Sequence, residues 1–339
     1  MKLGVVGDIH WSKYSSIVRQ RGKKYSLRLE NCIDSVNWAE EVLKDCDKII
    51  YLGDFFDSDI LKSEEITALS ELKWNDKEHI FLVGNHELGL HDLSFSSAHL
   101  FNIANKVVID KPVVQVDSYA HVELCFLPYI LDNTGRIEDY IHVMTNKIPK
   151  IIFSHNDIAG IQLGKFLTTS GFDIEDIECN CDLFINGHLH NETCINHKIY
   201  NIGNLTGQNF SEDAFRYGHK VFIINTETLD IQKIENPFAF KFFKFENVED
   251  LLKYNFPSNS VVTAKLYAEQ LNKVNEFIKD NENIVAHRFV VSSNNKHSNN
   301  LSTNSIQLSV DHLEKFQEFV LDRIGNNDLV NEEILEVVR

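Results

Sequence analysis

The chain has 339 residues, 43% of them hydrophobic, so it can bury a full core and should hold one large domain with something smaller beside it. Its 33 basic and 50 acidic residues give a formal net charge of −17, which on average repels nucleic acid and anionic membranes. No apolar run reaches the roughly eighteen residues of a membrane-spanning helix. We therefore expect a cytoplasmic protein without a membrane partner, whose six cysteines are reduced thiols.

Short β-branched segments alternate with helical patterns along the first half of the chain, and this order predicts an α/β fold with a layered sheet. Helices are expected over residues 27–44 and 134–146. The expected strands are 2–6, 48–52, 79–83, 122–127, 150–154 and 182–186, followed by the consecutive strands 198–203, 220–225 and 229–235.

Polar side chains follow five of these strands where each one ends. The segments are "GDIH" (7–10), "GDFFD" (53–57), "GNHE" (84–87), "SHND" (154–157) and "GHLH" (187–190). Because the carboxyl ends of strands in an open α/β sheet meet at one crevice, residues this far apart in sequence can converge. An extended backbone also sends residues two apart to the same side, so each His-containing pair should face one target.

The ligand types in these segments indicate a metal site. Asp, Asn and four His without Cys suit borderline to hard divalent cations, and they are too many for one ion. Two ions that share one carboxylate fit better. A single His or a single "GD" would more often be a core residue or a turn, but five such segments in this order favour a binuclear centre.

In their order and content, the five segments resemble the motifs of calcineurin-like metallophosphoesterases. The resemblance implies a four-layer α-β-β-α sandwich in which two cations clamp a phosphate and activate a shared water. Manganese is expected from the family, although Mg²⁺, Fe²⁺ and Zn²⁺ also suit the ligands. The implied ligands are Asp8, His10, Asp54 and His190 for one ion, and Asp54, Asn85, His155 and His188 for the other. His86 would protonate the leaving oxygen, and Asp57 would support a ligand or His86.

Further segments are similar to the Mre11/SbcD nucleases, and to their bacteriophage members in particular: "GDFFDS" (53–58), "FLPYI" (126–130) and "KIYNIGNLT" (198–206). Protein Ser/Thr phosphatases fit less well, because they carry Arg where Ser58 stands. A departure from the nucleases is Asn204, which stands where they have Ser. The resemblance implies a DNA exonuclease and endonuclease, a homodimer, that acts with an SbcC/Rad50-like ATPase in recombination, repair or end processing, in the host cytoplasm if of phage origin.

Four regions are expected along the chain. Residues 1–236 form the phosphoesterase domain, and 237–292 read as strand, helix, strand, helix, strand, similar to the small capping domain that contacts DNA in those nucleases. The Ser- and Asn-rich stretch 293–305 is expected to be a flexible linker, and 306–339 carries two amphipathic helical patterns that could bind the ATPase. The alternatives are a merely stabilising appendage and helices that fold on the protein's own core.

A run of cations without an acidic neighbour is the candidate DNA contact, although a solvated loop is the commoner fate of such a run. It comprises Lys13, Arg19, Arg21, Lys23, Lys24 and Arg28. Two other functions stay open. One is a phosphodiesterase or phosphatase that acts on nucleotides or other small substrates. The other is a binding protein with an inactive site, which the intact motifs argue against.

Overall fold

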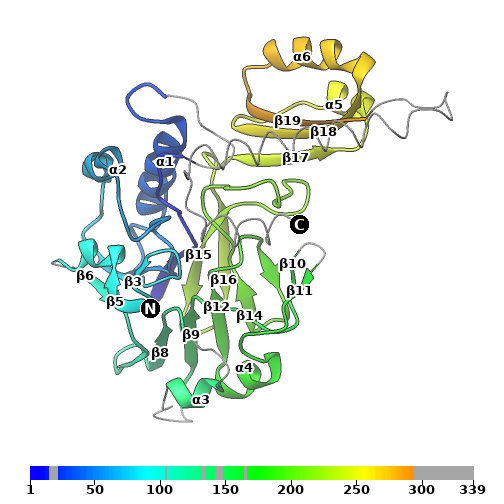
Figure 1. Cartoon of the computed structure of the whole chain (residues 1–339). Helices are drawn as coiled ribbons and strands as arrows, with labels where there is room; N and C mark the ends of the chain where they lie inside the picture. The colour runs from blue at the N-terminus through cyan, green and yellow to red at the C-terminus, as the bar shows by residue number, and fades with distance from the viewer. Residues whose placement is uncertain (15–21, 104, 132–134, 142–147, 164–165, 293–339) are drawn as a thin grey trace, which may run out of the picture. The chain divides into compact units, whose positions relative to one another are not determined.

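The computed structural model describes residues 1–14, 22–103, 105–131, 135–141, 148–163 and 166–292 (Figure 1). Within them, one six-stranded sheet has the order β16-β15-β1-β2-β3-β6. Strands β1, β2, β3 and β6 run parallel, whereas β15 and β16 extend the sheet antiparallel. The strands are β1 (Lys2–Val6), β2 (Lys48–Tyr51), β3 (Glu78–Leu82), β6 (Lys106–Ile109), β15 (Lys220–Asn225) and β16 (Ile231–Glu235).

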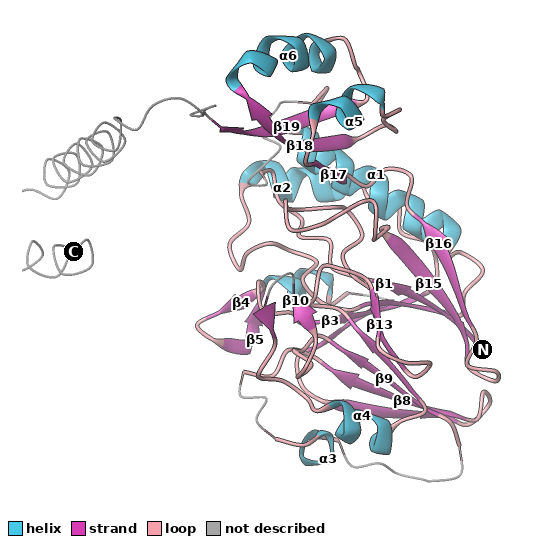
Figure 2. Cartoon of the chain, turned by 90° about the vertical axis from the view of Figure 1, so that its right-hand side faces the viewer, coloured by secondary structure: helices cyan, strands magenta, loops and turns pink. Residues whose placement is uncertain are grey.

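A second six-stranded sheet has the order β13-β14-β12-β9-β8-β7. Its strands β8, β9 and β13 are labelled in Figure 2. Its four inner strands are parallel, and the two edge strands pair antiparallel. The strands are β7 (Val113–Asp117), β8 (Val122–Leu127), β9 (Lys150–Ser154), β12 (Leu183–Asn186), β13 (Thr193–Cys194) and β14 (Ile199–Asn201).

Successive side chains of a strand point to opposite faces of its sheet, and this explains how the two sheets pack. Leu3 and Val5 of β1 share one apolar cluster with Phe126 and Phe153 of the second sheet, so this core joins the two sheets. The opposite face of the first sheet packs against α1 (Leu27–Val42), which begins where the Ser26 side chain accepts a hydrogen bond from the Leu29 amide. Burying both faces of central parallel strands accounts for their nearly continuous apolar sequences.

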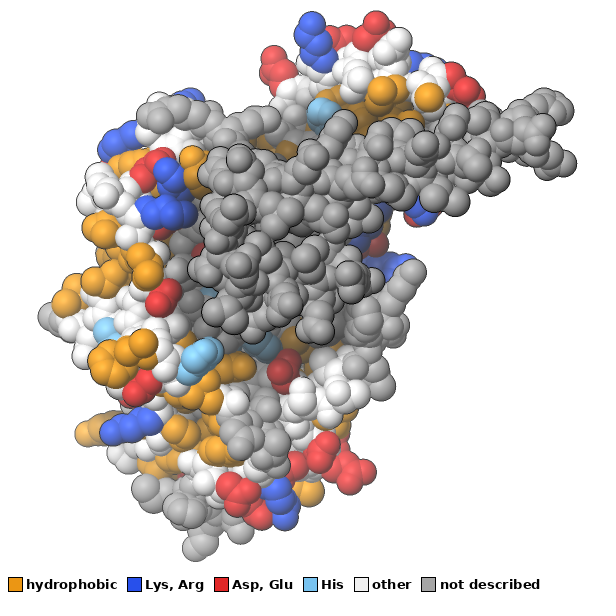
Figure 3. Space-filling view, in the orientation of Figure 1, with side chains coloured by type: hydrophobic (Ala, Val, Ile, Leu, Met, Phe, Trp, Pro, Cys, Tyr) orange, Lys and Arg blue, Asp and Glu red, His pale blue; other side chains and the backbone are white. Residues whose placement is uncertain are grey.

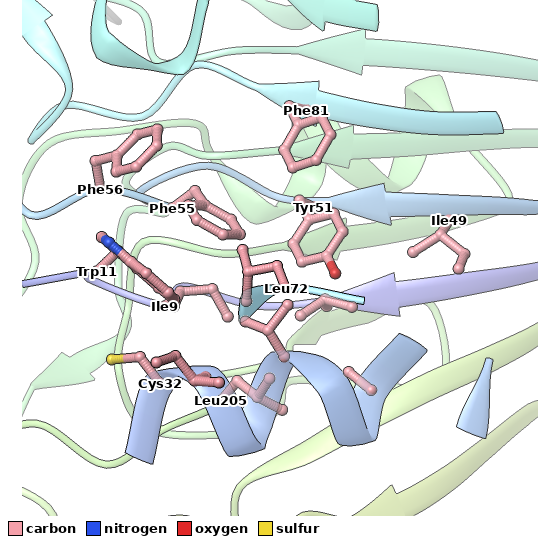
Figure 4. Packing of buried hydrophobic residues seen from close by; sticks show 14 of the residues in the cluster. Ile9, Trp11, Cys32, Ile49, Tyr51, Phe55, Phe56, Leu72, Phe81 and Leu205 are labelled. Atoms are coloured by element: carbon pink, nitrogen blue, oxygen red, sulfur yellow. The ribbon is translucent and has the colours of Figure 1, made fainter. Parts of the chain in front are cut away.

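An aromatic cluster lies directly under the segments that carry the polar motifs (Figure 4). The rings of Tyr51 and Phe81 stack with centroids 4.7 Å apart, and Phe55 packs edge-on against Tyr51. Trp11 stacks on Phe55 at 6.0 Å. The cluster therefore anchors the loops that follow β1 and β2 on a rigid apolar base.

All nine expected strands of the first 235 residues are found, and 27–44 forms the expected helix. The helix expected over 134–146 is wrong in extent, because only α3 (Ile137–Tyr140) forms and 142–147 lie outside the described residues. Several short elements were missed: the strands β6, β7 and β13, α2 (Ser63–Ala68), the 3₁₀ helices Leu69–Glu71 and Ser97–Phe101, α4 (Ile174–Asn180), the pair β4 (Leu88–Gly89) and β5 (Asp92–Ser96), and the pair β10 (Gln162–Leu163) and β11 (Phe166–Leu167). Unlike the buried strands that were predicted, the missed strands are mostly half-buried or exposed, so no strong apolar run marks them.

The C-terminal described part has the expected order of strand, helix, strand, helix, strand. Its sheet runs β17-β18-β19, and Phe243, Val262, Leu266 and Val274 belong to its own apolar cluster. The elements are β17 (Lys241–Phe245), α5 (Val248–Lys253), β18 (Ser260–Tyr267), the 3₁₀ helix Ala268–Gln270, α6 (Leu271–Lys279) and β19 (Ile284–Ser292). The expected linker 293–305 and helices 306–339 lie outside the described residues. Among the described helices, none has the length and apolarity needed to span a membrane.

Candidate metal centre

The expected ligands come from both sheets. Asp8 and Asp54 follow β1 and β2, and Asn85 follows β3, whereas His155 follows β9 and the 188–190 segment follows β12. The structure brings all seven side chains together. Asp8, His10, Asp54 and His155 are almost completely buried, so the centre lies at the base of the site rather than on its surface.

One group of ligand atoms consists of Asp8, His10 and His190, whose side-chain atoms lie within 4.8 Å of one another. His10 Nε2 lies 3.0 Å from His190 Nε2 and 3.8 Å from Asp8 Oδ2. Asp8 Oδ2 is buried and has no hydrogen-bond partner among the described residues, while Asp8 Oδ1 accepts from the His188 amide. An orphaned buried carboxylate oxygen beside two imidazoles fits a cation-binding position, because a bound ion would remove the cost of leaving it unpaired.

The second group consists of Asp54, Asn85, His155 and His188. Asn85 Oδ1 lies 3.2 Å from His155 Nε2 and 3.0 Å from His188 Nδ1. Asp54 Oδ2 lies 3.2 Å from His155 Nε2. With metal-ligand bonds of about 2.1 Å, neighbouring ligands of one ion are about 3.0–3.4 Å apart, so these separations suit a common ion.

Asp54 also lies near the first group. Its Oδ2 faces His155 and also lies 4.0 Å from His10 Nε2. Its Oδ1 accepts a hydrogen bond from the His86 amide at 2.9 Å, which fixes the carboxylate plane. The oxygen that remains is therefore placed between the two groups, as a bridging ligand requires.

The backbone at the centre is unusual. His10, Asp54 and His188 adopt left-handed conformations with φ of 50°, 48° and 68°, which cost energy for residues that carry a Cβ. Close approach also explains one motif glycine, because a Cβ on Gly84 would lie 2.1 Å from Asp54 Oδ1. Left-handed backbone at these three positions indicates that the surrounding packing holds the side chains in place.

The titrating groups of the centre are strongly coupled. Burial opposes protonation of His155, but the adjacent Asp54 carboxylate raises the pKa of His155 to about 9. Burial likewise opposes ionisation of Asp54, yet the charge of His155 holds the pKa of Asp54 well below its usual range. Burial raises the pKa of the Glu87 carboxyl to about 7, and this carboxyl accepts from the amides of Phe56 and Gly84. Without a cation, the imidazoles thus supply the positive charge that the carboxylates need.

This coupling predicts how the stability of the metal-free protein depends on pH. A raised folded-state pKa of His155 stabilises the fold below its unfolded value of about 6.5, and that stabilisation is lost as pH rises through about 9. The melting temperature in chelator should therefore fall between pH 7 and pH 9. Added Mn²⁺ should raise it more at pH 9 than at pH 7, because binding displaces ring protons. Scanning calorimetry at both values checks this, and a metal-free melting temperature that rises toward pH 9 contradicts it.

The two expected catalytic residues lie at the rim of the centre. The Asp57 Oδ1 atom is 3.1 Å from His10 Nδ1 and 3.7 Å from His86 Nδ1, so the carboxylate holds the His10 ring more closely than it holds His86. The His86 side chain is 42% exposed and packs edge-on against His10, with centroids 4.7 Å apart. His86 is thus the accessible imidazole of the centre, where a substrate can reach it.

Only some residues of the basic run expected to contact DNA are free to do so. The expectation that Arg28 contacts DNA is wrong, because its side chain is only 1% exposed. Its guanidinium donates to the carbonyls of Ile9, His10 and Gly207, so it stabilises the loop that carries His10 instead of facing solvent. Lys13 pairs with Glu64 and Lys24 with Glu71.

The basic run has three further members, Arg19, Arg21 and Lys23. Arg19 and Arg21 lie outside the described residues. Lys23 is exposed. Among the described side chains visible in Figure 3, cations and anions are interspersed and form no broad basic patch.

Several contacts of the centre were missed from sequence. Asp157 Oδ1 lies 3.2 Å from His188 Nε2, and Gln208 donates to Asp57. Asn209 Nδ2 lies 3.0 Å from His190 Nδ1. Asp157 is the last residue of the "SHND" segment, which was the one available signal. The loop with Gln208 and Asn209 carries no metal-ligand spacing.

The clustered carboxylate, amide and imidazole side chains fit a metallohydrolase centre. The comparison with known families agrees: residues 1–192 match the Calcineurin-like phosphoesterase family, and the chain belongs to it. No curated protein matches the chain significantly. Membership makes the chain a hydrolase of phosphoesters that uses divalent metal ions. When bound, such ions supply Lewis acidity toward the phosphoryl oxygens and an activated water. The chain's own residues hold these side chains in place, and the exposed His86 imidazole lies at the rim.

Proposed function

We propose that this phosphoesterase is a DNA nuclease subunit of the Mre11/SbcD type that hydrolyses phosphodiesters with two Mn²⁺ ions. The observation that carries the proposal is that the β17-β18-β19 part is tied directly to the loop beside the metal centre. Phe240 donates to the Thr206 carbonyl, Phe242 accepts from the Ala214 amide, and Lys244 Nζ donates to the Ser211 carbonyl. A small substrate has no evident need of such an attachment.

A pocket at this junction supports a polyanionic substrate. Its volume is about 450 Å³, and one of its lining residues, Asn191, directly follows His190 in the chain. Asn191, Ser211, Arg216, Tyr217 and Lys244 are among its lining residues. Arg216 lies 3.5 Å from Asp213, which partly offsets the positive charge. A strand that enters the metal centre could place a neighbouring phosphate against Lys244 and Arg216.

The proposal extends to partners. Residues 306–339 would bind an SbcC/Rad50-like ATPase through their amphipathic patterns, and the subunit would work as a homodimer in the cytoplasm, in recombination, repair or end processing. Exposed apolar side chains in 60–103 are consistent with a protein interface, among them Ile60, Leu90, Phe95 and Ile103.

The alternative is hydrolysis of nucleotides or other small phosphoesters. It is favoured by the net charge of −17 and by the pairing of Lys13 and Lys24 with glutamates, both of which reduce the attraction for a long polyanion.

The test compares two substrates, end-labelled linear duplex DNA and bis-p-nitrophenyl phosphate, each with Mn²⁺. For the double variant Arg216→Glu, Lys244→Glu we expect DNA cleavage to fall at least about tenfold, with a shallower salt dependence, because phosphate contacts are lost. Hydrolysis of the small ester should stay unchanged. Lys253→Glu, an exposed change on α5, is the matched control. No cleavage of DNA by the wild type, together with turnover of the small ester, would favour the alternative.

A further inference from the structure

The metal-ligand imidazoles differ in what lies behind them. His10 Nδ1 faces the Asp57 carboxylate at 3.1 Å, and His155 Nδ1 faces the Leu52 carbonyl at 2.8 Å. His188 Nε2 faces the Asp157 carboxylate at 3.2 Å. Each acceptor can pair with an N–H on the outer nitrogen, so the inner nitrogen is the one that offers its lone pair when a cation binds.

His190 has a donor behind it instead. Its Nδ1 lies 3.0 Å from Asn209 Nδ2. The orientation of this amide is set by its other end, because Asn209 Oδ1 accepts from the Ser211 amide at 2.8 Å and from the Ser211 hydroxyl. The buried Glu212 carboxylate secures the loop by accepting from the amides of Gln208 and Asn209.

The amide orientation determines the tautomer of His190. Since Asn209 donates to Nδ1, the proton of the neutral ring lies on Nε2. Nε2 is also the atom that lies 3.0 Å from His10 Nε2 in the group with Asp8. In the metal-free protein a proton therefore occupies the direction in which His190 would bind a cation.

We infer that Asn209 makes the position formed by Asp8, His10 and His190 the weaker and more readily exchanged of the two cation sites. Coordination through Nε2 moves the ring proton of His190 to Nδ1, where it meets the N–H group of Asn209. Two donors cannot pair. This conflict between two N–H groups is removed only if the Asn209 amide turns, which breaks both hydrogen bonds from Ser211. The site of Asn85, His155 and His188 carries no such conflict, because acceptors lie behind both of its rings.

Metal binding without substrate tests this inference. The full-length metal-free protein is titrated with Mn²⁺, and the free ion is followed by electron paramagnetic resonance. The wild type should show two classes of site whose dissociation constants differ at least about tenfold, the usual effect of a neighbouring group on a ligand. Asn209→Asp offers one oxygen to Ser211 and the other to His190, so it should tighten the weaker class about tenfold. Asn191→Asp adds the same charge one residue from His190 without an acceptor at Nδ1 and is the control.

Two equal classes of site in the wild type would overturn the inference. So would an Asn191→Asp variant that tightens binding as much as Asn209→Asp, because charge alone would then explain the effect. Nitrogen NMR of the metal-free wild type at mildly alkaline pH gives a check that needs no variant. It should show His190 protonated on Nε2, and a proton on Nδ1 would contradict the inference. Neither measurement involves DNA or turnover, so a protein with a different phosphoester substrate gives the same result.

Discussion

Replacing Asp54 by asparagine should reduce phosphodiester hydrolysis by about 10³-fold or more. Asp54 Oδ2 faces both groups of the centre, at 3.2 Å from His155 Nε2 and 4.0 Å from His10 Nε2. A neutral amide cannot bridge two cations, and losing metal-based stabilisation of the transition state costs several kcal/mol, each 1.36 kcal/mol being a factor of ten in rate. Steady-state rates with saturating Mn²⁺ give the loss, and metal analysis should show fewer than two bound ions.

Asp59→Asn is the matched control for this change. Asp59 lies in the same loop, is exposed and contacts the Ser58 hydroxyl, so its amide variant should keep the wild-type rate. The fold should survive in Asp54→Asn, because the amide oxygen can still accept from the His86 backbone. An Asp54→Asn protein that binds two ions and keeps a tenth of the activity would show that the bridge is not needed.

The residues of the metal centre could be predicted because they follow strands directly. A strand has a period of two and a strong apolar signal, so its end is easily located, and "GDIH" and "GHLH" stand at such ends. Parallel strands then bring their ends together whatever the length of the intervening helices. The convergence of Asp8 and Asp54 required only that topology, whereas His188 also requires the second sheet to pack against the first.

The residues that hold the predicted ligands in place could not be predicted in this way. Asn209 reaches His190 from a loop without regular structure, and its role depends on which end of the amide Ser211 binds. Arg28 fails for a related reason: in sequence it is one more cation in a basic run, but its helix turns it inward onto the carbonyls of Ile9 and His10. Burial of a charged group depends on tertiary packing, which a local pattern does not report.

Replacing His86 by alanine should lower DNA hydrolysis by about 10² to 10⁴-fold while both cations still bind. His86 is the exposed imidazole of the centre, and it packs against His10 beside the ligand Asn85. A group in this position can protonate the leaving sugar oxygen, which is a poor leaving group without a proton. A nitrophenolate leaves readily, so hydrolysis of bis-p-nitrophenyl phosphate should fall much less. The ratio of the two losses therefore measures proton transfer apart from general damage to the site.

His91→Ala is the control for removal of an exposed imidazole from the neighbouring turn, and it should leave both rates unchanged. The other possibility is that His86 is itself a metal ligand, because ligand atoms of His86, His10 and Asp54 also lie within 4.8 Å of one another. Metal analysis distinguishes this role from that of a proton donor. If His86→Ala loses a bound ion and both substrates slow equally, His86 is a ligand. If it keeps two ions and the loss is confined to the substrate with the poor leaving group, His86 is the proton donor, because only bond cleavage at that oxygen depends on an acid.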